Sequence, residues 1–408
     1  MKFSKHERIK NTDTKEVKYS VIRYMGSKKM TSSSKDESNR NLGFTLGNTA
    51  LIMLLSILGI SLLRTYTSGD PLLYIIPNML MFTPFRQLNI QMWEKFGKAI
   101  DKSIEHDMTR IPHIKAEDYT YESLKKASEN FKYPVLIKGL LSESQAVQKW
   151  SEPGYLSSKI GDWIIPVVNN AKYGTIQNDR SMRTFRESYE EILEDKDSKL
   201  YLFFPVQSRF SFNNTEKARL KDLQKAINKV VLEDLNTDRI WNGFGSNGHK
   251  TFFGTQIIAG RGSNDTSTTT GTGWHCAIGN NWFAQIVGRK RWYFMDAKYS
   301  SYMLPLRGGK VNMQTGREKE GGMSQYHKHI PLKYADVEAG DLLYNPDWEW
   351  HTIKNYEGLS IGVPLREVNI SLSIQNNAQY TSIVLANLAL DKLGIDIGGY
   401  PPQTGDEK

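Results

Sequence analysis

The stretch GTGWHCAIGNNWFAQIVGRKRWYF, residues 271–294, decides the fold and raises the main question about function. Its pattern is typical of β-strands, in which residues two apart face the same side, so His275 and Ala277 share a face. His351 lies in a second strand-like segment, GDLLYNPDWEWHTIKN (340–355). Two imidazoles and usually one carboxylate, with open positions beside them, form a non-haem iron site. Here Ala277 stands where the carboxylate is expected.

Short strand-like runs dominate the chain beyond residue 110, with few helices between them. The runs lie at 133–141, 162–170, 199–206, 250–260, 282–296, 340–355 and 360–374. Helices are expected over 217–235 and 379–395, and after 133–141, where Ser142 could be an N-cap. We expect a mainly β fold, a sandwich or barrel with flanking helices.

The two segments together resemble the JmjC/cupin-like branch of the 2-oxoglutarate, iron(II) oxygenases, most closely the asparaginyl-hydroxylase-like pattern. The resemblance spans roughly residues 110–380 and implies a double-stranded β-helix, or jelly roll. By this resemblance His275 is the proximal iron ligand and His351 the distal one. Lys290 would pair with the far carboxylate of 2-oxoglutarate, and the polar groups flanking that cosubstrate would be Thr272 and Asn281. The implied cofactors are Fe(II), 2-oxoglutarate and O2.

Ala277 has three explanations, which belong to different functional classes. In the halogenase branch of this superfamily, Ala or Gly replaces the carboxylate and chloride or bromide takes its position, so that an unactivated aliphatic C–H bond is chlorinated. Alternatively, the site is a hydroxylase whose third ligand is water or Glu349, which precedes His351 by two residues. The third explanation is a non-catalytic cupin-like binding module. Because the cosubstrate residues are complete, we expect the halogenase, with Ala277 marking the halide position.

The other metal-binding residue types carry weaker patterns. Cys276, the single cysteine, excludes an internal disulfide and a cysteine-based zinc site, and it faces away from His275. His327 and His329 have the spacing of a metal pair but lie in a Gly-rich, charged region. The histidines without a partner by spacing are His106, His113 and His249.

The formal net charge of +9 is concentrated at the N-terminus. Residues 1–43 hold 11 Lys and Arg against 5 Asp and Glu, so the basic character belongs to a tail that we expect to be disordered. No zinc-finger, RNP or helix-turn-helix pattern is present in the sequence, and nucleic acid is not an expected partner.

An uncharged apolar run, residues 46–63, predicts a single transmembrane anchor over 44–66. A signal peptide is one alternative interpretation, and the basic region of about forty residues before the run disfavours it. A buried core helix is another, and the absence of a polar face disfavours it. The basic flank predicts a cytosolic N-terminus in an endomembrane protein. If the apolar stretch 71–85 re-crosses the bilayer, the catalytic domain lies on the cytosolic side.

Residues 67–109 are expected to form an interfacial and amphipathic juxtamembrane segment, followed by the catalytic domain at 110–408. A barrel held near a bilayer favours a lipid or other membrane-delivered small molecule as substrate, although a purely topological anchor is equally admissible. The sequons at Asn213 and Asn264 matter only in a lumenal domain.

Overall fold

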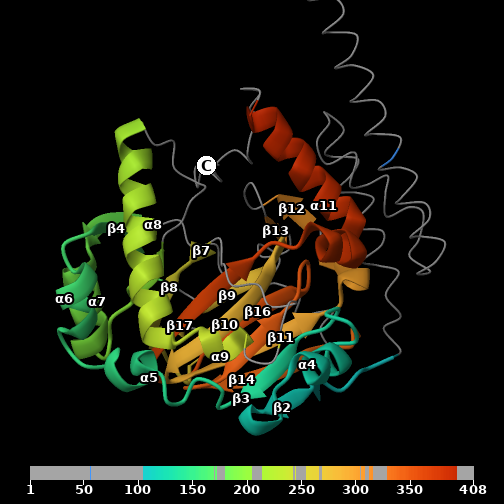
Figure 1. The fold of residues 1–408 in the computed structure, drawn as a ribbon, viewed down its shortest axis with the longest axis horizontal. Coiled ribbons are helices and arrows are strands. Elements are labelled where there is room, and N and C mark those ends of the chain that lie inside the picture. The colour runs from blue at the N-terminus through green and yellow to red at the C-terminus, as the bar shows by residue number, and fades with distance from the viewer. Residues whose placement is uncertain are drawn as a thin grey trace, which may run out of the picture. The chain divides into compact units, whose positions relative to one another are not determined.

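The computed structural model describes residue 56 and residues 104–392, except 170, 172–179, 205–213, 242–243, 245–253, 266–268, 304, 308–311 and 316–328. Contacts divide the chain into a unit of residues 1–55, outside the described part, and a unit of residues 56–408. The described residues of the second unit are folded around two β-sheets (Figure 1).

The first sheet has seven strands, and its inner strands carry both histidines. Their order is β1 (Thr109–Arg110), β14 (Lys333–Glu338), β11 (Arg289–Met295), β16 (Trp350–Asn355), β9 (Gly271–Ala277), β13 (Asn312–Thr315) and β12 (Pro305–Arg307). Except for the parallel pair β1–β14, neighbouring strands are antiparallel.

The second sheet has ten strands, and β10 and β17 lie near its middle. The order is β2 (His113–Lys115), β3 (Val135–Lys138), β15 (Leu342–Asn345), β10 (Asn280–Val287), β17 (Gly358–Glu367), β8 (Ile257–Gly262), β6 (Tyr201–Phe204), β4 (Ile164–Val168) and β5 (Arg180–Thr184), with β7 (Gly254–Thr255) also paired to β17. Only β2–β3 is a parallel pair among those described.

The two sheets pack face to face around an apolar interior. Buried side chains from the second sheet, such as Phe283 and Leu343, form one cluster with Trp292, Phe294 and Ile353 from the first. The alternate residues of the second sheet point outward into a larger core beneath the helices. The prediction of a mainly β fold is thus confirmed, and the mixed sheets with flanking helices fit a jelly roll.

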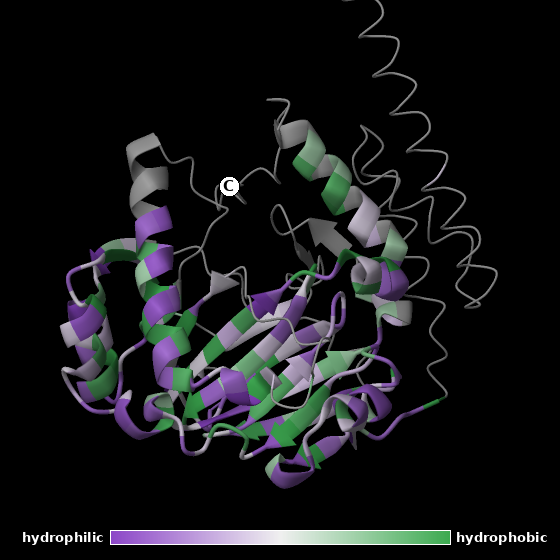
Figure 2. Cartoon of the chain, viewed as in Figure 1, coloured by the Kyte–Doolittle hydropathy of each residue, from purple (hydrophilic) through white to green (hydrophobic). Residues whose placement is uncertain are grey.

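Helices cover the outer face of the second sheet on one side of Figure 1. They are α5 (Gln145–Lys149), α6 (Tyr155–Ile160), α7 (Phe185–Glu194) and α8 (Asn214–Leu235). Figure 2 shows apolar and polar segments alternating along α8, the pattern of a helix with one buried face. Ser144, rather than the predicted Ser142, caps α5, because the strand ends at Lys138 and a turn occupies the next residues.

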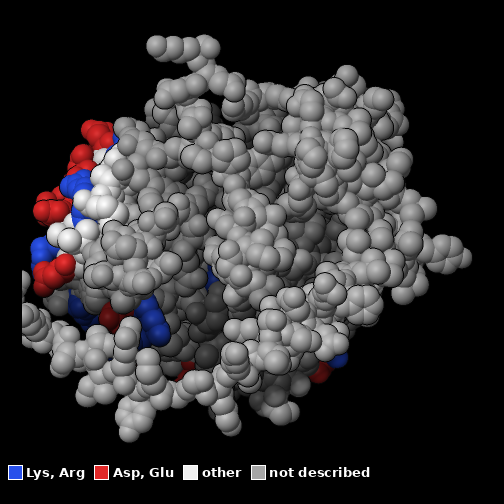
Figure 3. Space-filling view, turned by 90° about the horizontal axis from the view of Figure 1, so that it is seen from above, with Lys and Arg blue, Asp and Glu red and all other residues white. Residues whose placement is uncertain are grey.

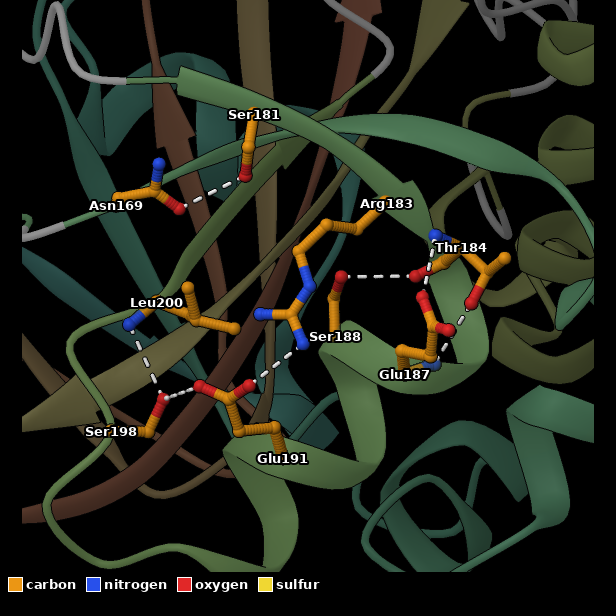
Figure 4. A network of polar contacts seen from close by, with 9 residues as sticks. All are labelled: Asn169, Ser181, Arg183, Thr184, Glu187, Ser188, Glu191, Ser198 and Leu200. Carbon is orange, nitrogen blue, oxygen red and sulfur yellow. Dashed lines mark hydrogen bonds and ion pairs between the residues drawn. The ribbon is translucent and has the colours of Figure 1, made fainter.

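Helix α7 is held to the sheet by its cap and by one ion pair (Figure 4). Thr184 and Glu187 form a capping box, and Ser188 donates to the Thr184 carbonyl. Arg183 of β5 pairs with Glu191, whose carboxylate also accepts from Ser198. Described charged side chains of both signs are intermixed along one edge of the view in Figure 3.

Helix α11 (Ile370–Lys392) begins earlier than predicted. The preceding strand β17 ends at Glu367, whereas the sequence pattern suggested a strand to residue 374. It is kinked at Asn377, whose φ of −157° is non-helical and whose side chain accepts from the Tyr380 N–H. Trp348 Nε1 donates to Thr381, which ties the helix to the loop before β16.

The predicted anchor over 44–66 lies outside the described residues, apart from residue 56, and most of the juxtamembrane segment lies outside them as well. Within the described part, no helix is long and apolar enough to cross a membrane. The anchor and the tail over 1–43 therefore stay predictions.

Candidate iron and 2-oxoglutarate site

The two predicted ligands, His275 and His351, are brought together by the pairing of β9 with β16. They are directly opposed in the register, and their ring centroids lie 4.2 Å apart. His275 Nδ1 lies 2.8 Å from the Gly273 carbonyl, and His351 Nδ1 lies 2.8 Å from the Glu349 carbonyl. A carbonyl can only accept, so each Nδ1 carries the proton and each Nε2 keeps its lone pair for a metal.

Burial keeps both imidazoles neutral, the form that binds a metal. It lowers the pKa of His275 to about 4, against a smaller upward effect of the bond to Gly273. Burial lowers the pKa of His351 well below its usual range, and the neighbouring His275 lowers it further. Nε2 of His351 is buried with no hydrogen-bond partner, as expected of a nitrogen that awaits a metal.

A β-bulge explains why Thr272 joins His275 although the two are three residues apart. His351 pairs with His275, and Ile353 pairs with Thr272, so one residue of β16 between these pairs opposes two of β9. Regular alternation would place Thr272 and His275 on opposite faces of the sheet. The extra residue in the bulge puts both side chains on the same face. The Thr272 hydroxyl is buried without a partner among the described residues, which fits a group reserved for a ligand.

Asn281 faces the same interior from the second sheet, as predicted for a cosubstrate group. It lies between Asn345 of β15 and Arg366 of β17 in the register, so the three side chains form a row across the sheet. Oδ1 of Asn281 and Oδ1 of Asn345 are buried with no hydrogen-bond partner in the described part. Unsatisfied buried polar atoms are rare in native proteins, and these two come from neighbouring strands whose side chains face the same interior.

Lys290 is fully buried inside the barrel and is not the surface residue that the GRKR turn could suggest. Its Nζ donates to Asn355 Oδ1 at 2.6 Å, and Asn355 in turn donates to Thr270. No described carboxylate pairs with it, and burial lowers the pKa of Lys290 to about 7. A buried ammonium with only a neutral partner fits the far carboxylate of 2-oxoglutarate, which would restore its charge.

Ala277 lies two residues after His275 at the end of β9, opposite Asn312 of β13. Among the described residues, no third His, Cys, Asp or Glu joins the histidines in a group that could hold a metal. Glu349 is buried, with 5% of its surface exposed, yet it forms no such group. Trp348, just before it, has φ 63°, so the chain is not a regular strand at that residue.

Arg366 is a site residue that the sequence patterns did not single out. It lies opposite Asn281 in the register, and its charge makes a small contribution to the lowered pKa of both His275 and His351. Burial lowers the pKa of Arg366 itself to about 10, and no described carboxylate pairs with it. The available signal was one arginine directly after the apolar run IGVPL (361–365).

The other histidines within the described part of the chain do not form a metal-binding group with this pair. His329 Nδ1 bonds to the Ile104 carbonyl at 2.9 Å, and His327 lies outside the described residues, so their pairing stays a prediction. His106 and His113 are exposed, and His249 is outside the described part. Cys276 points away from the histidines into a core with Trp274 and Trp350, as strand alternation predicted.

The cupin-like domain family matches residues 124–365, which include every residue predicted to bind iron or cosubstrate. No curated protein matches the chain. The match runs from α4 to β17, which leaves out only β1, β2 and the last two residues of β17 from the two sheets, and it is consistent with the JmjC-like 2-oxoglutarate and iron oxygenase class. The chain belongs to the cupin-like domain family.

Proposed function

We propose that the protein is an iron(II)- and 2-oxoglutarate-dependent halogenase that chlorinates an unactivated aliphatic C–H bond. The observation that carries this proposal is the pair His275 and His351 with Ala277 in place of a carboxylate and no other acidic ligand among the described residues. A halide beside Ala277 would complete the site.

In this proposal His275 and His351 hold iron through their Nε2 atoms, and Lys290 holds the far carboxylate of 2-oxoglutarate. Thr272 and Asn281 flank the cosubstrate with the buried polar atoms that the protein leaves unsatisfied. With O2, the iron and cosubstrate supply the oxidising power to remove hydrogen from an aliphatic carbon. The protein orients these groups and excludes water with Trp292 and Phe294.

Charge supports an anion in the position beside Ala277. Both histidines are neutral, and no described acidic side chain joins them to offset the charge of a divalent cation at the pair. Arg366 adds a positive charge that acts on both rings. In a buried site of low dielectric this charge favours a small anion, whereas a negative side chain would repel it.

The test is anaerobic titration with Fe(II) and 2-oxoglutarate, with and without chloride, followed through the visible charge-transfer band. We expect the band to shift with chloride and product analysis to show halogenated material. An unchanged band, with 2-oxoglutarate turnover that ignores halide, would instead indicate the hydroxylase. Absence of iron and 2-oxoglutarate binding would indicate the non-catalytic module.

Two variants sharpen this test. Ala277→Asp supplies the missing carboxylate, so we expect chloride sensitivity and halogenation to disappear while iron still binds. Glu349→Gln is the matched control, because it replaces a buried carboxyl group outside the ligand pair. Loss of iron in Glu349→Gln would favour a replacement acid and contradict the halide site.

Membrane attachment through 44–66 and a lipid or membrane-delivered substrate remain part of the proposal. The apolar run supports them, and the catalytic domain over 110–408 would then act near the bilayer. A chain beginning at residue 104 should lose activity on membrane-delivered substrates. Full turnover of that chain, confined to water-soluble substrates, would overturn this part alone.

A further inference from the structure

Six aromatic side chains surround a cavity of about 350 Å³ on the outer face of the second sheet. They form a closed circuit in which each ring contacts the next, with centroids 4.9–6.0 Å apart. In order around the circuit these are Tyr121, Phe131, Tyr344, Trp282, Trp241 and Phe244. They come from α4 (Tyr121–Ala127), β15, β10, α9 (Asp238–Trp241) and two loops.

One carboxylate, that of Glu367, belongs to the wall of this cavity. It is buried, and Trp282 Nε1 donates to its Oε2 at 2.8 Å, which fixes the charge beside the rings. Its charge contributes to the raised pKa of Tyr344 and of Asp347, although burial is the larger cause for both. The lining residues, all within the described part, include no lysine or arginine.

The cavity is separate from the iron site, although the same strands build both. Asn280 and Glu367 are paired across β10 and β17 and line the cavity, whereas their neighbours Asn281 and Arg366 face the barrel interior. The rim includes Asn369 and the exposed Ser371 at the start of α11, so the cavity reaches solvent there.

We propose that this cavity binds an alkylated ammonium group, either free or as a lipid headgroup. A quaternary ammonium needs no hydrogen-bond acceptor, and its charge is stabilised by aromatic faces and by one carboxylate. The volume lies at the small end of ligand pockets, which suits a compact cation. Lys125, on the partly exposed side of α4, already places its ammonium 5.9 Å from the Tyr121 ring.

The test is calorimetric titration of the full chain, in a maltoside detergent, with choline and with its neutral isostere 3,3-dimethylbutan-1-ol. We expect choline to bind about tenfold more tightly than the isostere, since only choline gains from the charge. Glycerophosphocholine distinguishes the two possible sources of the ammonium group. If it binds as tightly as choline, the natural ligand is a lipid headgroup; if it binds more weakly, the natural ligand is a free ammonium compound. Either result supports the proposal.

Glu367→Gln keeps an acceptor for Trp282 but removes the charge, so we expect about tenfold weaker choline binding and unchanged binding of the isostere. Glu357→Gln is the matched control, because this exposed carboxylate lies outside the cavity and should leave both affinities unchanged. If Glu367→Gln fails to fold, Tyr121→Leu at the partly exposed rim replaces it, with the same selective loss expected. No choline binding, or equal binding of choline and the isostere, would overturn the proposal.

Discussion

At the residue scale, the buried Lys290 indicates that the barrel interior is a ligand-binding site and not only an apolar core. A lysine buried without an anion destabilises a protein, and its bond to Asn355 offsets only part of that cost. The chain nevertheless places this ammonium in the interior that also holds Thr272, Asn281 and the two histidines. The arrangement is consistent with selection for binding a carboxylate rather than for stability.

Lys290→Met should therefore weaken 2-oxoglutarate binding by about 2–4 kcal/mol, on the order of 100-fold in Kd, while stability is unchanged or higher. Anaerobic calorimetry with a divalent metal measures the first effect and thermal unfolding the second. Lys354→Met is the matched control, because Lys354 is the partly exposed neighbour of Asn355. Equal losses in both variants would contradict the role of Lys290.

The same residue predicts a pH dependence. In the protein without 2-oxoglutarate, Lys290 has a pKa of about 7 and loses its proton as pH rises through 7. A bound carboxylate favours the charged form of Lys290. Binding of 2-oxoglutarate should therefore take up a proton above pH 7, and affinity should fall from pH 7 to 9. Lys290→Met should abolish that slope; a slope retained in the variant would assign it to another group.

At the element scale, the one-residue connection between β10 and β11, which lie in different sheets, and the bulge in β9 set the positions of the site residues. Gly288 makes the turn with φ 69°, and a Cβ there would lie 2.0 Å from the Leu359 carbonyl oxygen. This turn fixes Asn281 and Lys290 on opposite sheets of one barrel. The bulge brings Thr272 to the face of His275.

Gly288→Ala should lower the free energy of unfolding by about 1–3 kcal/mol, because alanine is strained at positive φ and meets backbone there. Chemical denaturation measures the change. Gly254→Ala is the matched control, since a Cβ at Gly254 meets nothing within 4 Å. An equal effect of the two substitutions would show that the turn is not the strained element.

At the scale of the whole molecule, two neutral histidines inside the barrel make the metal-free protein sensitive to acid. Their folded pKa values lie below the ordinary value of 6.5, so the unfolded chain binds more protons as pH falls below 6.5. Stability contributed by the neutral pair is present above that pH and is lost on acidification.

We expect the metal-free protein to lose about 2 kcal/mol per histidine between pH 6.5 and pH 5. Denaturant midpoints across this range measure the loss, and His275→Asn should make the decline shallower. His113→Asn replaces an exposed histidine and should leave the slope unchanged. An identical slope in His275→Asn would mean that another group governs the acid transition.

From the sequence alone follow the mainly β class and the strands around 271–296 and 340–355, and the family resemblance groups His275, His351, Lys290, Thr272 and Asn281 at one site. Strand alternation is a local signal that holds for His275 and Cys276, whereas it would place Thr272 on the face opposite to His275. Only the tertiary structure added Arg366, set Glu349 apart from the histidine pair and closed six aromatic rings around one cavity. These features depend on sheet register, a bulge and the packing of distant segments, which the spacing of residues along a chain does not encode.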